Sequence, residues 1–200
     1  MVSKTRERFI EVARQLFARK GVENTTMNDI ASASEKGRRT IYTYFKSKRE
    51  IFNAVIASET DQLLTKLKDI VSTQTSPREK LIKYIDCRFE TMNEIVARNG
   101  SLKAGFFRDV RKVDRARKLI TDKETALLLD ILKEGVEKGD FKLSNLNHFA
   151  LMITHTIHGL DVPYIRDSLS KEGMSQDELK QSLIQLILNG IENKKETVTA

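Results

Sequence analysis

The chain has 200 residues, of which 40% are hydrophobic and 32% charged, so it can bury a core as one large domain or two small ones. No stretch approaches the roughly 18 apolar residues of a membrane span, the first residues lack the apolar segment of a signal peptide, and the single cysteine, Cys87, cannot form an intramolecular disulfide. These features argue against a membrane protein and a disulfide-stabilised secreted protein, and we expect a cytoplasmic one.

The net charge of +7 is concentrated at one end of the chain. Residues 1–50 contain 12 Lys or Arg and 6 Asp or Glu, whereas the other 150 contain 23 and 22. This asymmetry predicts a head that binds a polyanion, attached to a nearly neutral body. Nucleic acid and an anionic membrane surface both fit such a head, and a basic face without function is the remaining alternative.

Apolar periodicity predicts four helices in the first third of the chain. The segment 4–21 places one apolar stripe on a helix that ends at Gly21; its residues are Phe9, Val12, Ala13, Leu16 and Phe17. Thr26 and Asp29 form the capping pattern of a short helix, and a second short helix turns Ile41 and Phe45 inward. Ser47 and Glu50 then begin a helix that extends to about residue 72. Two short helices in tandem predict a helix-turn-helix.

The remaining sequence is also helical by its periodicity. Helices are expected over 77–98, 114–138, 145–167 and 176–193, with a loop and a short helix near 98–112. We therefore predict an all-α fold of about nine helices. We expect residues 1–47 to form the helix-turn-helix head and residues 48–200 to form a larger helical bundle.

The solvent face of the second short helix fits the major groove of B-DNA. Arginine reads guanine with two hydrogen bonds, and a threonine methyl contacts thymine. The ammonium group of lysine and the hydroxyl group of tyrosine bind phosphates. The candidates in and beside this helix are Lys36, Arg38, Arg39, Thr40, Tyr42, Thr43, Tyr44, Lys46 and Lys48. The backbone amides at the helix starts near Thr26 and Ser47 add phosphate sites.

These motifs resemble the TetR family of transcriptional regulators. The resemblance rests on Gly21, on "TTMNDIA" at residues 25–31 and on "TIYTYFKSK" at residues 40–48, and it covers residues 1–50 closely. The rest of the chain is similar only in length and helical character. Two features depart from the family pattern: the turn reads Ser34-Glu35-Lys36-Gly37 where Ala-Gly-Val-Ser is usual, and Arg39 replaces a small residue.

The resemblance implies an effector-controlled regulator, in particular a repressor, that binds a palindromic operator as a dimer and is released by a small molecule. It assigns base reading to Arg38, Arg39 and Thr40, and phosphate contacts to a second group. That group consists of Thr26, Tyr42, Tyr44 and Lys48. The alternative for the tyrosines is that they only pack the head.

The resemblance further assigns effector binding and dimerisation to the body, residues 48–200. The last two helices are apolar over a wide arc, and the resemblance implies that they form a four-helix bundle with a second copy; burial within a monomer is the alternative. Aromatic and sulfur-containing side chains with a few polar groups are typical of a ligand pocket, although such residues are also common in cores. The pocket candidates are Phe89, Met92, Phe106, Phe107, Leu128, Met152, His155 and Tyr164.

An enzyme is the alternative function. His155, His158 and Asp161 follow one another at three-residue spacing and could hold a metal or perform acid–base chemistry. The sequence has no His-Glu-x-x-His motif and only one other histidine, so polar groups at an interface or pocket wall are the favoured interpretation. Cys87 is interpreted as a small hydrophobic residue, with a reactive thiol beside Arg88 as the alternative. We expect no metal and no cofactor.

Overall fold

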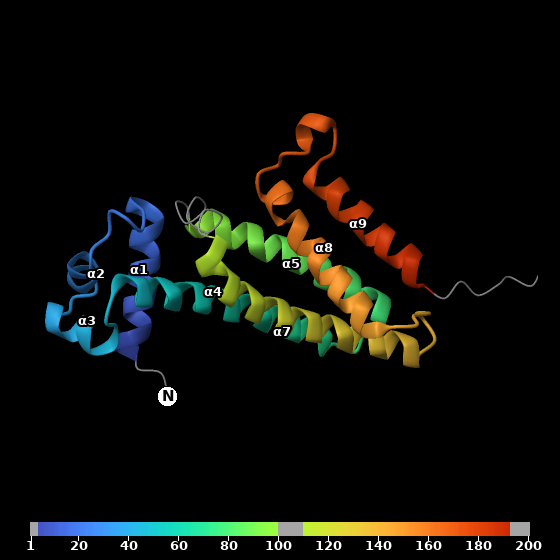
Figure 1. Ribbon diagram of the computed structural model, residues 1–200, viewed down its shortest axis with the longest axis horizontal. Coiled ribbons are helices and arrows are strands. Elements are labelled where there is room, and N and C mark those ends of the chain that lie inside the picture. Colours follow the sequence, from blue (N-terminus) through green and yellow to red (C-terminus); the bar gives the residue numbers. More distant parts are fainter. Residues whose placement is uncertain (1–3, 100–109, 193–200) are drawn as a thin grey trace, which may run out of the picture. The chain divides into compact units, whose positions relative to one another are not determined.

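A computed structural model describes residues 4–99 and 110–192 of the chain (Figure 1). These residues form eight α-helices and one 3-10 helix, with an isolated β-bridge between Phe141 and Glu192 and no strand within the described ranges. The predicted all-α class is confirmed, with a count close to the predicted number. None of the described helices combines the length and hydropathy that a membrane span requires.

The described helices agree with the predicted ones to within a few residues. Their bounds are α1 Lys4–Lys20, α2 Met27–Ala33, α3 Arg38–Tyr44, α4 Lys48–Val71, α5 Pro77–Asn99, α7 Val110–Glu137, α8 Leu146–Ile165, the 3-10 helix η1 Ser170–Glu172 and α9 Gln176–Ile191. The largest difference is at α7, which begins at residue 110 instead of 114. Part of the predicted loop near 98–112 lies outside the described residues.

The chain packs as two compact units, residues 1–62 with 93–117 and residues 63–92 with 118–200. The first unit contains α1, α2, α3 and most of α4, and the second contains α8, α9 and most of α5 and α7. We call them the head unit and the body unit. The sequence predicted DNA binding for residues 1–47 and effector binding with dimerisation for residues 48–200. This division concerns function and not packing, and it stays a prediction.

The core of the head unit is built from the predicted apolar stripes. Phe9, Ala13, Leu16 and Phe17 of α1 are buried against Ile30, Ala31, Ile41, Phe45, Ile51 and Val55. The rings of Phe9 and Phe45 meet edge to face, with centroids 6.5 Å apart and an interplanar angle of 81°. Helix α1 ends at Lys20, and the next residue, Gly21, has a φ of 86°, in the left-handed region that glycine adopts without steric cost. The head is therefore a packed three-helix core with α4 as its fourth wall.

The body unit is held together by one buried face from each of its long helices. Buried residues include Leu81, Tyr84, Ile85 and Phe89 of α5, Leu128, Ile131 and Leu132 of α7, Ile153 and Ile157 of α8, and Leu183 and Leu188 of α9. Gly135 of α7 permits close packing, because a Cβ there would lie 2.0 Å from the Phe141 ring. Asn145 caps α8, and a capping box of Ser175 and Glu178 begins α9. Helices α8 and α9 lie side by side (Figure 1).

Candidate nucleic-acid interface and buried polar cluster

Helix α3 has one side in the head core and the other in solvent. Ile41 is fully buried, and Phe45, which follows the last residue of the helix, is 1% exposed. The exposed residues of the helix are Arg38, Arg39, Tyr42 and Thr43. Because the buried side fixes the helix on the head, the exposed side presents its cations and hydroxyls in a defined arrangement.

Several side chains on this exposed surface are already positioned. The Arg38 guanidinium carbon lies 5.9 Å from the centroid of the Tyr42 ring, a cation–π contact. The Thr43 hydroxyl donates to the carbonyl oxygen of Arg39 at 3.2 Å. Lys36 and Lys46 are exposed beyond the two ends of the helix. Four of the predicted DNA-binding residues, Arg38, Arg39, Tyr42 and Thr43, are therefore exposed on α3.

Three of the predicted contacts, Thr40, Tyr44 and Lys48, are half-buried. The Tyr44 ring lies 5.9 Å from that of Phe9 and so helps to pack the head. The Lys48 ammonium donates to the carbonyl oxygens of Val22 and Glu23, at 2.7 and 3.1 Å, which ties the start of α4 to the loop after α1. Tyr44 and Lys48 thus have structural roles, whatever they contribute to phosphate binding.

The start of α2 has the predicted capping box. The Thr26 hydroxyl oxygen accepts from the Asp29 backbone N–H at 3.1 Å, and the Asp29 carboxylate accepts from the Thr26 backbone N–H at 2.9 Å. The hydrogen bonds from the Thr26 backbone and side chain lower the pKa of Asp29. Thr26 is exposed and its hydroxyl hydrogen can still be donated, which is compatible with the predicted phosphate contact.

The turn between α2 and α3 has an unusual backbone. Glu35 adopts a φ of 56°, a left-handed conformation that costs a residue with a Cβ about 1–2 kcal/mol. Arg8 of α1 supports the turn, because its Nε donates to the Ser34 carbonyl oxygen at 3.0 Å and its Nη2 lies 3.0 Å from the Glu35 carboxylate. The Ser34 hydroxyl is buried and has no hydrogen-bond partner among the described residues.

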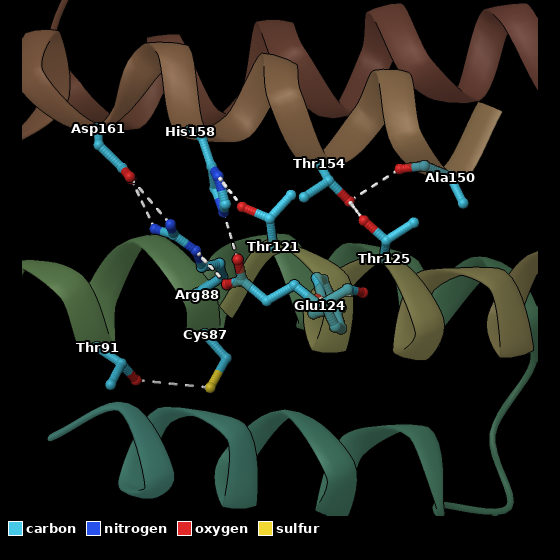
Figure 2. Close-up of polar contacts among 11 residues, drawn as sticks. Cys87, Arg88, Thr91, Thr121, Glu124, Thr125, Ala150, Thr154, His158 and Asp161 are labelled. Atoms are coloured by element: carbon cyan, nitrogen blue, oxygen red, sulfur yellow. Dashed lines mark hydrogen bonds and ion pairs between the residues drawn. The ribbon is translucent and has the colours of Figure 1, made fainter. Parts of the chain in front are cut away.

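The body unit contains a buried polar cluster centred on Arg88 of α5 (Figure 2). The Arg88 side chain is 3% exposed and extends toward Glu124 of α7 and Asp161 of α8. Its Nε donates to Glu124 at 2.7 Å, and its two Nη groups donate to the two oxygens of Asp161 at 2.6 and 2.9 Å. One guanidinium thus joins three helices and binds two carboxylates.

His158 completes the cluster from α8 (Figure 2). Its Nε2 contacts the second oxygen of Glu124, and its Nδ1 lies 3.5 Å from the Thr121 hydroxyl. The Tyr84 hydroxyl donates to the backbone carbonyl of Glu124 at 3.2 Å. Glu124 is therefore held by three neighbours, through both its carboxylate oxygens and its backbone.

Burial and pairing act in opposite directions on the ionisation of this cluster. For Arg88, burial favours the neutral form, but the carboxylates of Glu124 and Asp161 outweigh it and raise the pKa. For Glu124, burial again favours the neutral form, but Arg88 and His158 lower the pKa. Burial raises the pKa of Tyr84 well above its usual value. The arginine and Glu124 are consequently a charged pair inside the body unit.

A small space adjoins the cluster. It is partly open to solvent but has no room for a water molecule, and its lining consists of Tyr84, Arg88, Glu124, Leu128, Thr154, Ile157 and His158. Its wall combines apolar side chains with a charged, hydrogen-bonding end, which is the usual character of a small-molecule site. Because not even a water molecule fits there, any ligand would have to displace side chains to enter.

Comparison with known proteins identifies the fold and the head. The family model described as "Bacterial regulatory proteins, tetR family" matches residues 9–55, which include most of α1, all of α2 and α3 and the first turns of α4. The transcriptional repressor KstR2 of Mycolicibacterium smegmatis is 27% identical over 142 residues, 68% of this chain and 67% of that protein. A TetR/AcrR-family regulator from Thermobifida fusca matches with a TM-score of 0.67 and 26% identity, over 94% of this chain and 98% of the other.

The head of the chain, residues 9–55, matches the TetR family of bacterial regulatory proteins, and relatives that align with about two thirds of the chain are named transcriptional repressors or regulators. Proteins of this family regulate transcription and are not enzymes, so the alternative of a metal-dependent enzyme is not supported. A regulator from Saccharomonospora viridis, solved with choline, shares the fold with a TM-score of 0.73 at 21% identity, over 96% of this chain and all of the other. TetR-family regulators bind DNA and small molecules and typically act as dimers.

The unusual turn predicts a gain in stability for a variant with the TetR-family residue. Glu35 occupies the position at which the family usually has glycine, and Glu35→Gly should raise the free energy of unfolding by about 1 kcal/mol because glycine adopts a positive φ without strain. The lost ion pair with Arg8 is exposed and contributes little. Urea denaturation measures the change. Glu35→Ala is the matched control, since it also loses the ion pair but keeps the strain; a glycine variant no more stable than the alanine variant would contradict this explanation.

The structure places the predicted pocket residues of this TetR-family chain in three different settings. Leu128 lines the small space, and Phe89, Met92 and Tyr164 are buried in the body unit, where the Phe89 and Tyr164 rings lie 4.8 Å apart. Met152 and His155 are exposed on α8. Phe106 and Phe107 lie outside the described residues. Ligand binding by any of these residues stays a prediction.

Two residues of the predicted histidine group, His158 and Asp161, belong to the buried polar cluster, and the third, His155, does not. His155 is exposed, His158 contacts Glu124, and Asp161 binds Arg88. Among the described residues, no group of three or more His, Cys, Asp or Glu could hold a metal ion. Cys87 is half-buried with its sulfur 3.8 Å from the Thr91 hydroxyl, while the neighbouring Arg88 points to its carboxylates (Figure 2).

The charged residues that line the small space, Arg88 and Glu124, were not among the residues predicted from sequence. Arg88 lies three residues after Ile85 and four before Met92, within the apolar stripe of α5. Glu124 lies four residues before Leu128 and seven before Ile131, in the stripe of α7. A charged residue at a stripe position is the available signal, because such a residue must be paired when the helix packs.

Proposed function

We propose that this TetR-family regulator is a homodimeric repressor of the cytoplasm, which binds a palindromic operator and leaves it when a small molecule binds the body unit. The observation that carries the proposal is the α3 surface. Its exposed Arg38, Arg39 and Thr43 stand on a helix fixed by buried Ile41 and Phe45. A rigid helix with this chemistry fits the major groove of DNA.

A second copy is expected to pack on α8 and α9. Leu186 is 71% exposed and Met152 is 62% exposed, and Leu151 of α8 is also exposed. His155 and Gly159 follow Met152 on the same face of α8, and both are exposed. Large exposed apolar residues on paired helices favour an interface over a solvent-facing surface. Two heads joined in this way would reach half-sites about 34–36 Å apart.

Effector release would act through the separation of the two heads. Helix α4 begins in the head unit and extends into the body unit, so a tilt of α4 on effector binding would move each α3. Simultaneous contact with both half-sites would then be lost. The effector must prefer one conformer, by about 5.5 kcal/mol for a near-complete shift from bound to released.

Selection of bound duplexes from a random pool tests this function. We expect enrichment of an inverted repeat whose half-sites are one helical turn apart. The full-length protein is used at low ionic strength, where phosphate contacts are strongest. Absence of any enriched sequence would overturn the proposal of an operator-binding regulator, and enrichment of a single half-site would overturn the dimer.

The selected duplex then tests the roles of individual cations. Arg39→Ala is expected to weaken specific binding by about 1–3 kcal/mol and to relax base preference, because a bidentate contact to guanine is lost. Lys46→Ala should weaken binding to all duplexes alike and reduce the salt slope by about 1. Lys46 is a better phosphate probe than Lys48, whose ammonium also holds the head together. Fluorescence anisotropy on selected and scrambled duplexes separates the two effects, and equal losses on both duplexes for Arg39→Ala would refute base reading.

A further inference from the structure

The first turns of α1 carry cations that the stability of the helix does not explain. Lys4, Arg6 and Arg8 alternate along its first residues, and Glu7 is the acidic residue of the first turn. Cations at the start of a helix lie at the positive end of its dipole, whereas cations at its end are stabilising. A local preference that is broken in this way is expected where side chains serve binding. These cations are therefore candidates for contact with an anion.

Arg8 already has partners within the head unit. Its Nε donates to the Ser34 carbonyl oxygen, and its Nη2 lies 3.0 Å from the Glu35 carboxylate. By contrast, no carboxylate in residues 4–99 and 110–192 forms an ion pair with Arg6. The Arg6 guanidinium carbon lies instead 5.1 Å from the centroid of the Phe45 ring. Arg6 is therefore the arginine in the first turns of α1 whose charge is left for a partner.

The contact with Phe45 holds the Arg6 guanidinium in an orientation that suits an anion. The ring attracts the cation through its face, and Phe45 is only 1% exposed, so the core fixes the ring in place. The five N–H donors of an arginine lie in the plane of the guanidinium, so contact with its face leaves its edges able to donate. Two adjacent donors match two oxygens of one phosphate.

The same contact places Arg6 at the end of α3. Phe45 directly follows the last residue of this helix, and the next residue, Lys46, is exposed. The start of α1 accordingly lies beside the end of α3 (Figure 1). Phe9 of α1 packs against Tyr44 and Phe45, with ring centroids 5.9 and 6.5 Å away. The core of the head unit therefore fixes the position of Arg6 relative to α3.

The dimensions of α3 and of the major groove bring this position close to the DNA backbone. The seven residues of α3 span about 10 Å, and the groove is about 12 Å wide between two sugar-phosphate walls. A helix this short ends near one of the walls when its exposed side faces the bases. Side chains beside its end, such as Arg6 and Lys46, are then expected within reach of a phosphate.

We propose that Arg6 binds a backbone phosphate of the operator, so that α1 contributes to the DNA interface together with α3. Such a contact reads no sequence, but it fixes the register of α3 on the duplex. The inference rests on the proposed function, since it adds a contact to the same DNA-binding head.

Arg6→Gln on the selected duplex tests the contact, because it removes the charge and keeps a polar side chain. Fluorescence anisotropy over a salt series should show a slope that is lower by about 0.9 for each bound head. Because the contribution of a phosphate contact grows as salt falls from 1 M, the loss at 0.15 M salt should be about fivefold for each head. Arg6→Lys keeps the charge and should keep the slope. Selection with Arg6→Gln should return the wild-type sequence.

Duplexes in which single phosphates are replaced by neutral methylphosphonates locate the contact. The wild type should lose affinity at every phosphate that it binds. At one position in each half-site, the replacement should leave Arg6→Gln unaffected, because the charge that this phosphate binds has already been removed. A purely structural role of Arg6 on the Phe45 ring would lower the melting temperature without such a coupling.

Arg19→Gln is the matched control. It removes the same charge from an exposed position of α1, about 20 Å further along the helix axis. This variant should keep the wild-type salt slope and the wild-type response to every methylphosphonate. An equal loss in Arg19→Gln would reduce the effect to net charge and overturn the assignment to Arg6.

The outcomes separate this inference from the proposed function. A wild-type salt slope in Arg6→Gln, or an unchanged response to every methylphosphonate, would overturn the phosphate contact. A changed base preference in Arg6→Gln would overturn it as well, since it would assign Arg6 to base edges. In each case, an inverted repeat selected by the wild type would leave the regulator itself intact. A wild type that selects no duplex would instead overturn the regulator and this contact together.

Discussion

Replacement of Arg88 by methionine is expected to lower the free energy of unfolding by about 3–5 kcal/mol, because removing one partner of a buried ion pair leaves uncompensated charge. Glu124 and Asp161 are 2% and 5% exposed and would lose their shared cation. Urea denaturation measures the loss. Lys80→Met is the matched single substitution, and its effect should be smaller because Glu134 is more exposed and keeps Lys138, 2.7 Å away, as a partner.

The same cluster predicts strong non-additivity. Arg88→Met/Asp161→Leu should be more stable than Arg88→Met, because the second substitution removes a carboxylate that the first has left unpaired. Glu124 still contacts His158 in both variants. Two results would contradict this role of the Arg88 guanidinium. One is a loss of unfolding free energy in Arg88→Met no larger than in Lys80→Met. The other is a loss in the double variant equal to the sum of the losses in its two single variants.

The head could be predicted from sequence because its determinants are local. The Thr26–Asp29 and Ser47–Glu50 capping contacts each span three residues, and both form. One detail differs: the Glu50 carboxylate accepts from the backbone of Lys46 instead of the backbone of Ser47. The carbonyl contacts of Lys48 link positions about 25 residues apart, and no periodic pattern indicates them.

The body site could not be predicted in the same way, because its partners are far apart along the chain. Arg88 binds Asp161 across 73 positions and Glu124 across 36. Spacing along α8 grouped His155, His158 and Asp161 instead, but only His158 and Asp161 join the buried polar cluster, and His155 is exposed. An apolar arc as wide as that of α8 does not indicate which side is buried, so Met152 and His155 were assigned to a pocket and lie at the surface.

Charge on the α8–α9 surface is expected to separate the dimer. Met152→Glu and Leu186→Glu each place a carboxylate on an exposed apolar side chain of the predicted interface, and each should weaken dimerisation by about 2–4 kcal/mol if the residue is a central contact. Sedimentation should then report a mass near 22.9 kDa instead of twice that value. Operator affinity should fall together with the dimer, because a single head reads only one half-site.

The control for this experiment is Gln74→Glu, which adds the same charge to an exposed position in the loop between α4 and α5. It should leave both the mass and the operator affinity unchanged. The two interface variants should keep the melting temperature of the isolated protomer, since Met152 and Leu186 are mostly exposed and their replacement leaves no cavity. A glutamate variant that still sediments as a dimer would assign the interface to another surface. A monomer that binds the inverted repeat with wild-type affinity would show that the two heads act independently, and the geometric account of effector release would then fail.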